Sequence, residues 1–366
     1  MSTPPSGTDA MPISDQARRI DEASDLMRYS RQVLFDAIGE CGQRALLASR
    51  VTLIGCGALG TVIADTLVRA GVGFLRIVDR DFVEMNNLQR QVLFDERDAA
   101  DGMPKAVAAA QKLSAVNSTV MIEPVVADAH PGTIETYIDG AQLILDGTDN
   151  FETRFLINDV AVKHGMPWIY GACVAATGMV MPILPSRTPC LRCIWEQPPP
   201  PGMSPTCDTA GVLAPVVHLV AALQCVETVK VLTGKFEQLS RKLIQIDAWA
   251  GRFDAFDLQN AFESGDCPCC KGRRFDYLNS SGGSRTASLC GRDAVQIGAS
   301  GPEVDLQAVS ARVAAVAKFP PQINRYLLRF KVEDYEITLF RDGRAIIKGT
   351  HEPDTARSVY AKYIGN

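Results

Sequence analysis

The stretch VTLIGCGALG, from Val51 to Gly60, restricts the possible folds of this chain more than any other segment. An apolar run precedes glycines at positions 55, 57 and 60, and a helical stretch, TVIADTLVRAG, follows them. Small residues at a strand-to-helix turn let the backbone approach a phosphate, and the helix N-terminus favours its negative charge. Asp79 ends the next apolar run, where a carboxylate can accept hydrogen bonds from ribose hydroxyls. The segment predicts a nucleotide site, with a tight turn lacking any ligand as the alternative, and it does not distinguish NAD, FAD and ATP.

Short β-branched runs recur from this segment to about Gly171. The runs VTLIG, FLRIVD, VMIEPVVA, LILDGT and PWIYGA alternate with helical stretches such as PKAVAAAQKLSAV. This alternation is typical of a parallel sheet with helices on its faces. We therefore expect an α/β fold with a Rossmann-like, mostly parallel sheet and helices on both faces. The later stretch GVLAPVVHLVAALQCVETVKVLTG predicts one more helix, mostly buried.

Charge and cysteine content limit the class of protein. With 37 basic and 42 acidic side chains, the formal net charge is −5, which gives no support for nucleic acid as a partner. We expect no membrane span, since the apolar runs are short, and no signal peptide, since MSTPPSGTDAMPISD lacks an apolar core. The eleven cysteines, an odd number, favour metal ligands, a reactive thiol or buried thiols over a disulfide framework, and so a reducing cytoplasm.

Changes in composition divide the chain into four segments. Residues 1–25 are expected to form a flexible extension, residues 26–277 the nucleotide-binding domain, residues 278–288 a linker, and residues 289–366 a small α+β domain. In the last segment, DAVQIGA predicts a strand and YEITLFRDGRAIIKG a hairpin. Further expected features there are a helix capped by Asp305 with Leu306, Val309, Val313 and Val316 on one face, positive φ angles at Asp342 and Gly343, and a last helix from about Asp354.

Cations and carboxylates gather around the predicted nucleotide site. A hydride-transferring enzyme needs only to position a nicotinamide, and nothing in these segments is an obvious hydride partner. Attack of a carboxylate on the α-phosphate of a triphosphate brings two anions together, and arginine, lysine and a metal ion neutralise that charge. The set therefore favours ATP over NAD. Its members are Arg31 in RYSRQ, Asn86, Asn87, Gln89 and Arg90 in NNLQRQ, Lys105 behind Pro104, and Asp146 and Asp149 in DGTDN.

Six motifs, in the order RYSRQ, GCGALG, VDRDFVEMNNLQRQ, DGTDN, CLRC and TCDTAGVLAP, resemble those of the MoeB/ThiF/HesA adenylating enzymes, bacterial relatives of ubiquitin-activating enzymes. The resemblance covers roughly Leu26 to Phe275 and implies that residues 26–277 form an adenylation domain. It implies an ATP-dependent adenylyltransferase that activates the C-terminal glycine carboxylate of a ubiquitin-fold sulfur-carrier protein ending in Gly-Gly. Pyrophosphate would leave, and a sulfurtransferase or sulfide source would then allow a thiocarboxylate to form.

The resemblance also implies roles for individual residues. The glycine turn would hold ATP, and the carboxylate after the second strand would hold its ribose. In MoeB-like homodimers one active-site arginine comes from the partner subunit, so a homodimer is expected. The implied nucleotide-binding residues are Gly55, Gly57, Ala58, Gly60, Asp79, Asp81, Asn86, Asn87, Gln89, Arg90, Lys105, Asp149 and Asn150. The implied catalytic residues are Arg31, Arg90, Lys105, Asp149 and Cys207. Of these, Asp149 would bind Mg²⁺.

Two C-x-x-C pairs, in CLRC and CPCC, predict a zinc site. Four thiolates at such spacings suit tetrahedral Zn²⁺ in a closed structural site, with a redox pair or free thiols as the alternative. Cys269 lies inside the second motif and competes by position, but the two-residue gap and the resemblance favour Cys267. The predicted ligands are Cys190, Cys193, Cys267 and Cys270.

Cys207 lies near the end of the proline-rich stretch EQPPPPGMSPTCD, which predicts a mobile loop. A thiol there can attack an acyl-adenylate or receive sulfur as a persulfide. The matching cysteine links covalently to the carrier in ThiF-like relatives and is dispensable in MoeB-like ones, so a catalytic and a helix-capping role both stay open. Small core or boundary positions are expected for Cys41, Cys56, Cys173, Cys225 and Cys290.

Other functions stay open for the C-terminal segment and for the whole chain. CGRDAVQI resembles the C-terminal extension of some ThiF-type proteins, and the segment shows no rhodanese loop. The segment could dock a partner or serve as a structural cover. For the chain, the alternatives are adenylation of a peptide or another non-carrier carboxylate, a catalytically silent nucleotide-binding scaffold, and, least favoured, an NAD-dependent oxidoreductase.

Overall fold

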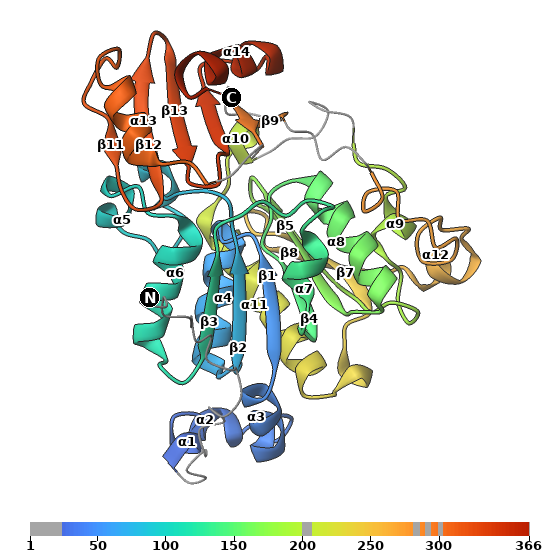
Figure 1. Cartoon of the computed structure of the whole chain (residues 1–366). Coiled ribbons are helices and arrows are strands. Elements are labelled where there is room, and N and C mark those ends of the chain that lie inside the picture. Colours follow the sequence, from blue (N-terminus) through green and yellow to red (C-terminus); the bar gives the residue numbers. More distant parts are fainter. Residues whose placement is uncertain (1–23, 200–206, 281–285, 290–293, 299–302, 366) are drawn as a thin grey trace, which may run out of the picture.

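The computed structural model describes residues 24–199, 207–280, 286–289, 294–298 and 303–365. Their strands form an eight-stranded sheet, ordered β3-β2-β1-β4-β5-β6-β7-β8, and a six-stranded sheet, ordered β11-β12-β13-β14-β10-β9 (Figure 1). The first five strands of the large sheet are parallel, as expected, and the last three are antiparallel to their neighbours. These strands are β1 (Arg50–Ile54), β2 (Phe74–Val78), β3 (Met121–Val125), β4 (Leu143–Asp146), β5 (Trp168–Val174), β6 (Thr177–Ile183), β7 (Lys242–Asp247) and β8 (Arg252–Asp257).

Helices cover both faces of the large sheet, which confirms the predicted α/β class. Alternate side chains of β1 enter two separate cores, Leu53 on one face and Ile54 on the other. The Leu53 face packs against α4 (Ala58–Ala70), α6 (Lys105–Val116) and α11 (Ala214–Leu232), and the Ile54 face against α7 (Ile134–Ile138) and α8 (Phe151–His164). Shorter elements are α5 (Glu96–Ala100), α9 (Leu191–Ile194), α10 (Cys207–Ala210), α12 (Gln259–Ser264), η1 (Met85–Asn87) and η2 (Phe236–Gln238).

Helix α11 corrects the expectation that the apolar runs are too short to span a membrane. Its 19 residues have a mean hydropathy of 1.5, enough by length and composition for a span, and it is the one such helix in the described part of the chain. The helix packs against α4, β5 and β6, and Val216, Val217 and Val220 are fully buried there. One side of α11 therefore packs in the core, but nine of its 19 residues are buried, whereas the sequence predicted a mostly buried helix.

Three short helices, α1 (Ser24–Met27), α2 (Ser30–Val33) and α3 (Gly39–Leu47), lie where the parallel strands begin (Figure 1). The carbonyl oxygen of Ser49 accepts a hydrogen bond from the first residue of β2, Phe74. The Arg28 guanidinium donates to the carbonyl oxygen of Val116, the last residue of α6. These contacts fix the N-terminal helices at the edge of the sheet opposite to the glycine turn.

The C-terminal domain is a sheet of β9 to β14 with α13 and α14 packed on one face. Asp305 caps α13 as predicted, and Leu306, Val309 and Val313 are buried. Three details were wrong: Val316 is exposed because α13 ends at Val313, only Gly343 of the hairpin turn has a positive φ, and β9 occupies part of the expected linker. The elements are β9 (Thr286–Leu289), β10 (Ala294–Ile297), α13 (Leu306–Val313), β11 (Gln322–Ile323), β12 (Leu327–Val332), β13 (Tyr335–Phe340), β14 (Ala345–Lys348) and α14 (Pro353–Tyr363).

A buried ion pair fixes the end of β4. Asp146 is fully buried, its Oδ2 accepts from Arg154 Nε at 3.0 Å, and its Oδ1 accepts from the backbone and hydroxyl of Thr148. Burial lowers the pKa of the Arg154 guanidinium, but Asp146 and Tyr170 raise it, and the net shift is upward. Asp146 therefore holds the DGTDN loop in place and faces the protein interior, although its position at a strand end suggested a ligand.

We expect Asp146→Ala to lower the free energy of unfolding by about 3–5 kcal/mol, because it leaves the Arg154 charge buried without its partner. Chemical denaturation monitored by circular dichroism measures the loss. Asp65→Ala is the matched control, since it breaks an exposed pair with Arg69 on α4 and should cost less than about 1 kcal/mol. Equal losses in the two variants would contradict a special role for the buried pair.

Candidate functional site

The glycine turn is shaped by close backbone contacts at the carboxyl ends of β1 and β4. Gly55 has a φ of 90°, and a Cβ there would lie 2.6 Å from the carbonyl oxygen of Gly147. A Cβ on Gly60 would overlap the carbonyl oxygen of Gly55, so only glycine lets the first turn of α4 approach the strand end. Backbone packing alone thus requires glycine at both positions, which agrees with the predicted tight turn between strand and helix.

Helix α4 begins at this turn and leaves its first backbone amides available to an anion. Its N-cap is Gly57, which has no side chain to accept hydrogen bonds from those amides, and Ala58 is the first helical residue. No acidic residue lies in the first turn of α4. The N-terminus of a 13-residue helix without a side-chain cap favours a phosphate by its unpaired amides and by its dipole.

Asp79 joins the glycine turn to the segment that follows β2. Its Oδ2 accepts from the backbone amide of Cys56 at 2.6 Å, and its Oδ1 accepts from the amide of Asp81 at 2.7 Å. Burial raises the pKa of the Asp79 carboxyl, while the nearby Lys105 acts in the opposite direction. Each carboxylate oxygen has a further lone pair, so Asp79 can still accept from ribose hydroxyls as predicted.

Lys105, the first residue of α6, is buried near the Asp79 carboxylate. Its Nζ lies 3.2 Å from Asp81 Oδ2, and its backbone amide donates to the carbonyl oxygen of Asp81. The amide of Val83 likewise donates to the carbonyl oxygen of Met103. The segment after β2 is thus paired with the residues that lead into α6, which brings the predicted lysine and both aspartates together.

The short helix η1 carries the amide side chains of NNLQRQ. Glu84 is the N-cap of η1: its carbonyl oxygen accepts from the Asn87 amide, and Asn87 Oδ1 accepts from the Glu84 amide. Asn87 is buried and donates to Asn86 Oδ1, whereas Asn86 and Gln89 are exposed. Arg90 donates to the carbonyl oxygen of Asn86 at 2.9 Å. The capped turn therefore fixes Asn86 and Arg90 relative to Asp79, while Asn87 serves the turn itself.

Asp149 and Asn150 follow β4 at the same edge of the sheet. Asp149 is exposed, and its charge acts on the guanidinium groups of Arg80 and Arg154. Asn150 accepts from the Thr153 amide and caps α8, so its nucleotide contact stays a prediction. Arg80 was missed from the sequence, although a basic residue between Asp79 and Asp81 is a signal. It forms an ion pair with Asp128 at 3.1 Å and lies 3.9 Å from Asp81.

Within one chain, the described structure does not bring Arg31 to the glycine turn, and the side chain of Cys207 lies outside the described residues. Arg31 is exposed on α2, beside the C-terminal end of α6, whereas Lys105 begins that helix. Twelve residues of helix separate those ends by about 17 Å. Cys207 is the first residue of α10, but its side chain and residues 200–206, predicted as a mobile loop, lie outside the described residues.

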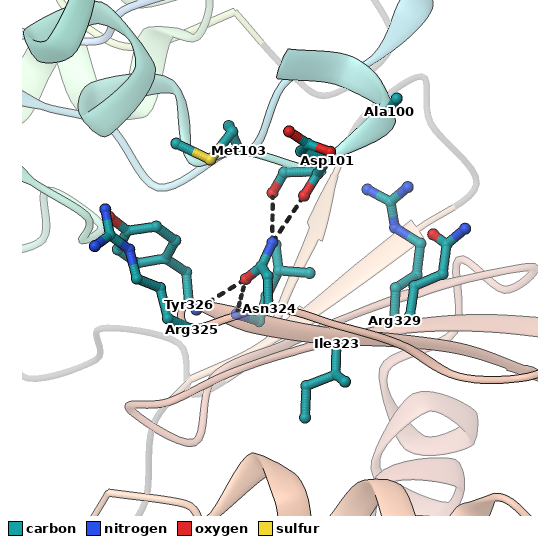
Figure 2. A pocket seen from close by; sticks show the side chains of 11 residues that line it. Ala100, Asp101, Met103, Ile323, Asn324, Arg325, Tyr326 and Arg329 are labelled. Carbon is teal, nitrogen blue, oxygen red and sulfur yellow. Dashed lines mark hydrogen bonds between the residues drawn. The ribbon is translucent and has the colours of Figure 1, made fainter. Parts of the chain in front are cut away.

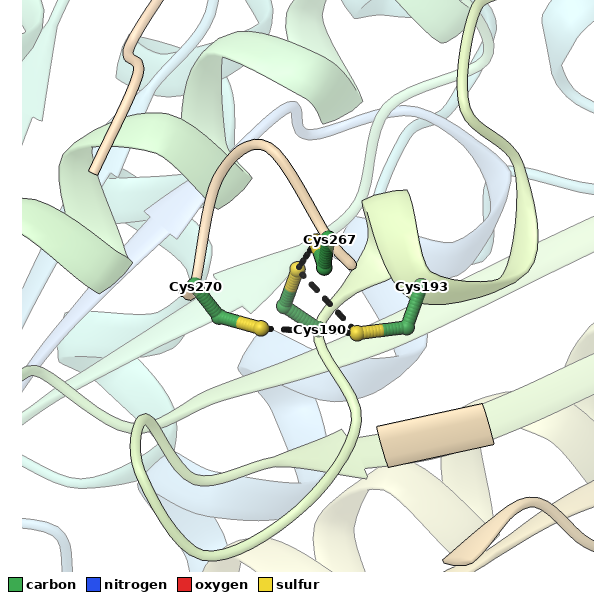
Figure 3. A group of neighbouring side chains, drawn as sticks. All are labelled: Cys190, Cys193, Cys267 and Cys270. Carbon is green, nitrogen blue, oxygen red and sulfur yellow. Dashed lines mark hydrogen bonds between the residues drawn. The ribbon is translucent and has the colours of Figure 1, made fainter. Parts of the chain in front are cut away.

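The four predicted zinc ligands form one cluster (Figure 3). The Sγ–Sγ distances are 3.6 Å from Cys190 to Cys267, 3.9 Å from Cys190 to Cys193 and 3.5 Å from Cys193 to Cys270. Zn–S bonds of about 2.3 Å in a tetrahedron require sulfur atoms about 3.8 Å apart. The cluster therefore fits one structural zinc ion.

Cys269 is not one of the four clustered cysteines, as the two-residue gap predicted. Its Sγ accepts from Asn158 Nδ2 and donates to Asp159 Oδ1. Asn158 Oδ1 also accepts from the amide of Leu191, and Asp159 from that of Tyr277, so α8 binds both cysteine loops. Sequence reasoning missed these two residues, for which the only signal is a polar pair inside a buried helix.

The other cysteines follow the expectation with one exception. Cys56 and Cys225 are buried and Cys173 is half-buried, whereas Cys41 is exposed on α3. Burial raises the pKa of the Cys225 thiol to about 12, which makes it unreactive. Cys290 lies outside the described residues.

Comparisons with known proteins agree with this geometry. The model of the ThiF family matches residues 29–269. The sulfur carrier protein ThiS adenylyltransferase of Bacillus subtilis (strain 168) is 43% identical over 340 residues, covering 92% of this chain and 99% of that protein. The SAMP-activating enzyme E1 of Haloferax volcanii is 37% identical over 68% of this chain and 90% of its own length.

Among solved structures, E. coli MccB shares the fold, with a TM-score of 0.56 and 23% identity over 66% of this chain and 71% of that one. The family model spans the glycine turn, the Asp79 segment, Lys105, the DGTDN loop and the first three cysteines of the cluster. On this evidence the chain belongs to the ThiF family.

Proposed function

We propose that this chain adenylates the C-terminal carboxylate of a ubiquitin-fold sulfur-carrier protein with ATP and releases pyrophosphate. The chain is an adenylyltransferase of the ThiF family, and its relatives across nearly its full length include a sulfur carrier protein adenylyltransferase. The observation that carries the proposal is the convergence of the glycine turn, Asp79, Lys105 and the capped η1 at one edge of the sheet. A sulfur donor would act next, and we place the reaction in the cytoplasm.

The geometry suits attack of a carboxylate on the α-phosphorus. The α4 N-terminus would hold phosphate oxygens, Asp79 the ribose, and Lys105 with Arg90 would offset the charge that builds up as the carboxylate oxygen bonds to phosphorus. The bond from the α-phosphorus to the bridging oxygen breaks, and pyrophosphate leaves. A Mg²⁺ ion on Asp149 would supply further positive charge.

A homodimer would complete this site. Arg31 lies at the far end of α6 from Lys105 within one chain, so its own subunit does not present it to the same nucleotide. We propose that it reaches the nucleotide of a partner subunit, as the family resemblance implies.

We predict one zinc ion per chain, measured by metal analysis after purification without chelator. Cys193→Ala should lose zinc and unfold at a lower temperature, because thiolate zinc sites add on the order of 10 kcal/mol to local folding. Cys269→Ala is the matched control and should keep its zinc, since Cys269 bonds to α8. Metal-free wild-type protein with full activity would refute the site.

We predict that Asp149→Ala slows ATP–pyrophosphate exchange about a hundred- to a thousand-fold while the fold survives, because one charge partner of the transition state is lost. Exchange is measured with a panel of ubiquitin-fold carriers. Glu152→Ala, an exposed carboxylate on the first turn of α8, is the control and should exchange normally. Normal exchange in a folded Asp149→Ala variant would remove the assigned role.

We predict that Cys207→Ala keeps pyrophosphate exchange but slows later sulfur transfer and removes any carrier adduct that reducing agent releases. Adenylation needs only the charged groups, whereas a thiolate is needed to attack the acyl-adenylate. Intact-mass spectrometry with ATP, carrier and sulfur donor measures both steps. Cys41→Ala, which removes an exposed thiol on α3, should behave as wild type. A full thiocarboxylate yield from Cys207→Ala would leave Cys207 without a catalytic role.

A further inference from the structure

The six-stranded sheet of the C-terminal domain is covered on both faces. Along β12, Leu328 and Phe330 join the core under α13 and α14, while Leu327 and Arg329 face the adenylation domain. The second face closes over Phe82, which is 4% exposed and packs with Ala294, Leu327, Phe340 and Ile346. Because Phe82 stands three residues after Asp79, this sheet packs directly on the segment that carries the nucleotide site.

Cationic side chains of this face contact the same segment. The Arg329 guanidinium lies 4.2 Å from the centre of the Phe82 ring, and Arg344 donates to the carbonyl oxygen of Arg80 at 2.9 Å. Gln296 of β10 donates to Asp128 Oδ2 at 2.9 Å, the carboxylate that also pairs with Arg80. The contacts thus reach the residues on either side of Asp81.

A cavity lies where the C-terminal domain meets the adenylation domain, and one side chain reaches across it. It has a volume of ≈ 500 Å³ and lies between the end of α5 and the β11–β12 turn (Figure 2). Asn324 reaches across it and donates to the carbonyl oxygens of Asp101 and Gly102, just before Met103 (Figure 2). The C-terminal domain therefore also holds the stretch that leads to Lys105.

Lys348, at the end of β14, contacts a residue that is itself bonded to the predicted phosphate-contacting turn. Its Nζ binds Glu84 Oε1, and the Glu84 backbone closes η1: its amide donates to Asn87 Oδ1 and its carbonyl oxygen accepts from the Asn87 amide. Asn87 in turn holds the Asn86 side chain, and the Asn86 carbonyl oxygen binds Arg90. Lys348 is thus linked through one carboxylate to the residues assigned to the phosphates.

We propose that the C-terminal domain positions the phosphate-contacting turn of the nucleotide site, and that Lys348 is the positioning residue, acting through Glu84. This inference rests on the proposed function, in which Asn86 and Arg90 contact the triphosphate. Lys348 anchors the Glu84 carboxylate and with it the backbone that closes η1, so η1 is held in one conformation before ATP binds. Preorganised contacts lower the entropy lost on binding, and ATP affinity is the quantity that Lys348 controls.

The test compares Lys348→Met with Lys331→Met, which removes an exposed lysine from β12 of the same sheet. We expect Lys348→Met to raise the KM for ATP about tenfold in pyrophosphate exchange and to leave the KM for the carrier unchanged. Lys348→Arg, which keeps the charge, should restore the ATP value, and Lys331→Met should match wild type. An unchanged KM for ATP in Lys348→Met would overturn the proposal, as would parallel rises for ATP and carrier.

A second variant tests the path through Glu84. Glu84→Gln keeps the backbone bonds to Asn87 and the length of the side chain, and removes the charge that Lys348 binds. We expect it to raise the KM for ATP as Lys348→Met does, and the double variant to add nothing to either single one. Additive effects would contradict the path, and melting curves identify a variant that fails to fold.

Equilibrium titration with ATP and Mg²⁺, which needs no carrier, separates this proposal from the proposed function. If no carrier supports exchange by the wild type, the proposed function fails, while a tenfold weaker ATP affinity of Lys348→Met would still support the positioning role. If the wild type exchanges normally and Lys348→Met binds ATP as tightly as Lys331→Met does, the positioning role fails while the proposed function stands.

Discussion

The carboxylate of Asp79 is the contact on which the site depends. Its two oxygens bind the backbone amides of Cys56, in the glycine turn, and Asp81, in the segment after β2. These groups come from different strand ends, so the carboxylate sets their distance before any nucleotide arrives. The buried, hydrogen-bonded position also limits its motion, because breaking either bond would leave an unpaired amide in a packed region. One side chain therefore fixes the glycine turn relative to the segment after β2, the two parts to which we assign the phosphates and the ribose.

The segment from Asp79 to Arg90 is short, and three parts of the protein restrain it. The glycine turn holds its first residue, the start of α6 pairs with its middle at Asp81 and Val83, and the C-terminal sheet covers Phe82 and binds Glu84. Irregular backbone lacks the repeating hydrogen bonds of a helix or strand and needs such external contacts to stay in one conformation. A domain more than 200 residues later in the chain thus contributes to a site near the N-terminus.

Sequence reasoning found the parts of the site that local spacing encodes. The glycine turn, Asp79, Lys105 and the C-x-x-C pairs each depend on neighbours only a few residues away, and each lies where it was predicted. The contacts of Lys348 with Glu84 and of Arg344 with Arg80 span 264 residues and use types that are usually exposed, so no local pattern marks them. Asp146 misled for another reason: its partner Arg154 is only eight residues away, but nothing in the sequence marks either charge as buried.

The cysteine cluster sets a comparable constraint at the other end of the large sheet. Cys190 and Cys267 are 77 residues apart, and a metal that joins them closes a loop containing α10, α11, β7 and β8. Closing a loop of this length lowers the conformational entropy of the unfolded chain. The entropy lost on loop closure grows only slowly as the loop becomes longer. Cys207 lies inside this loop, fourteen residues after Cys193. A structural metal at the cluster would thus restrain, from both ends, the segment that carries the cysteine to which we assign the later sulfur transfer.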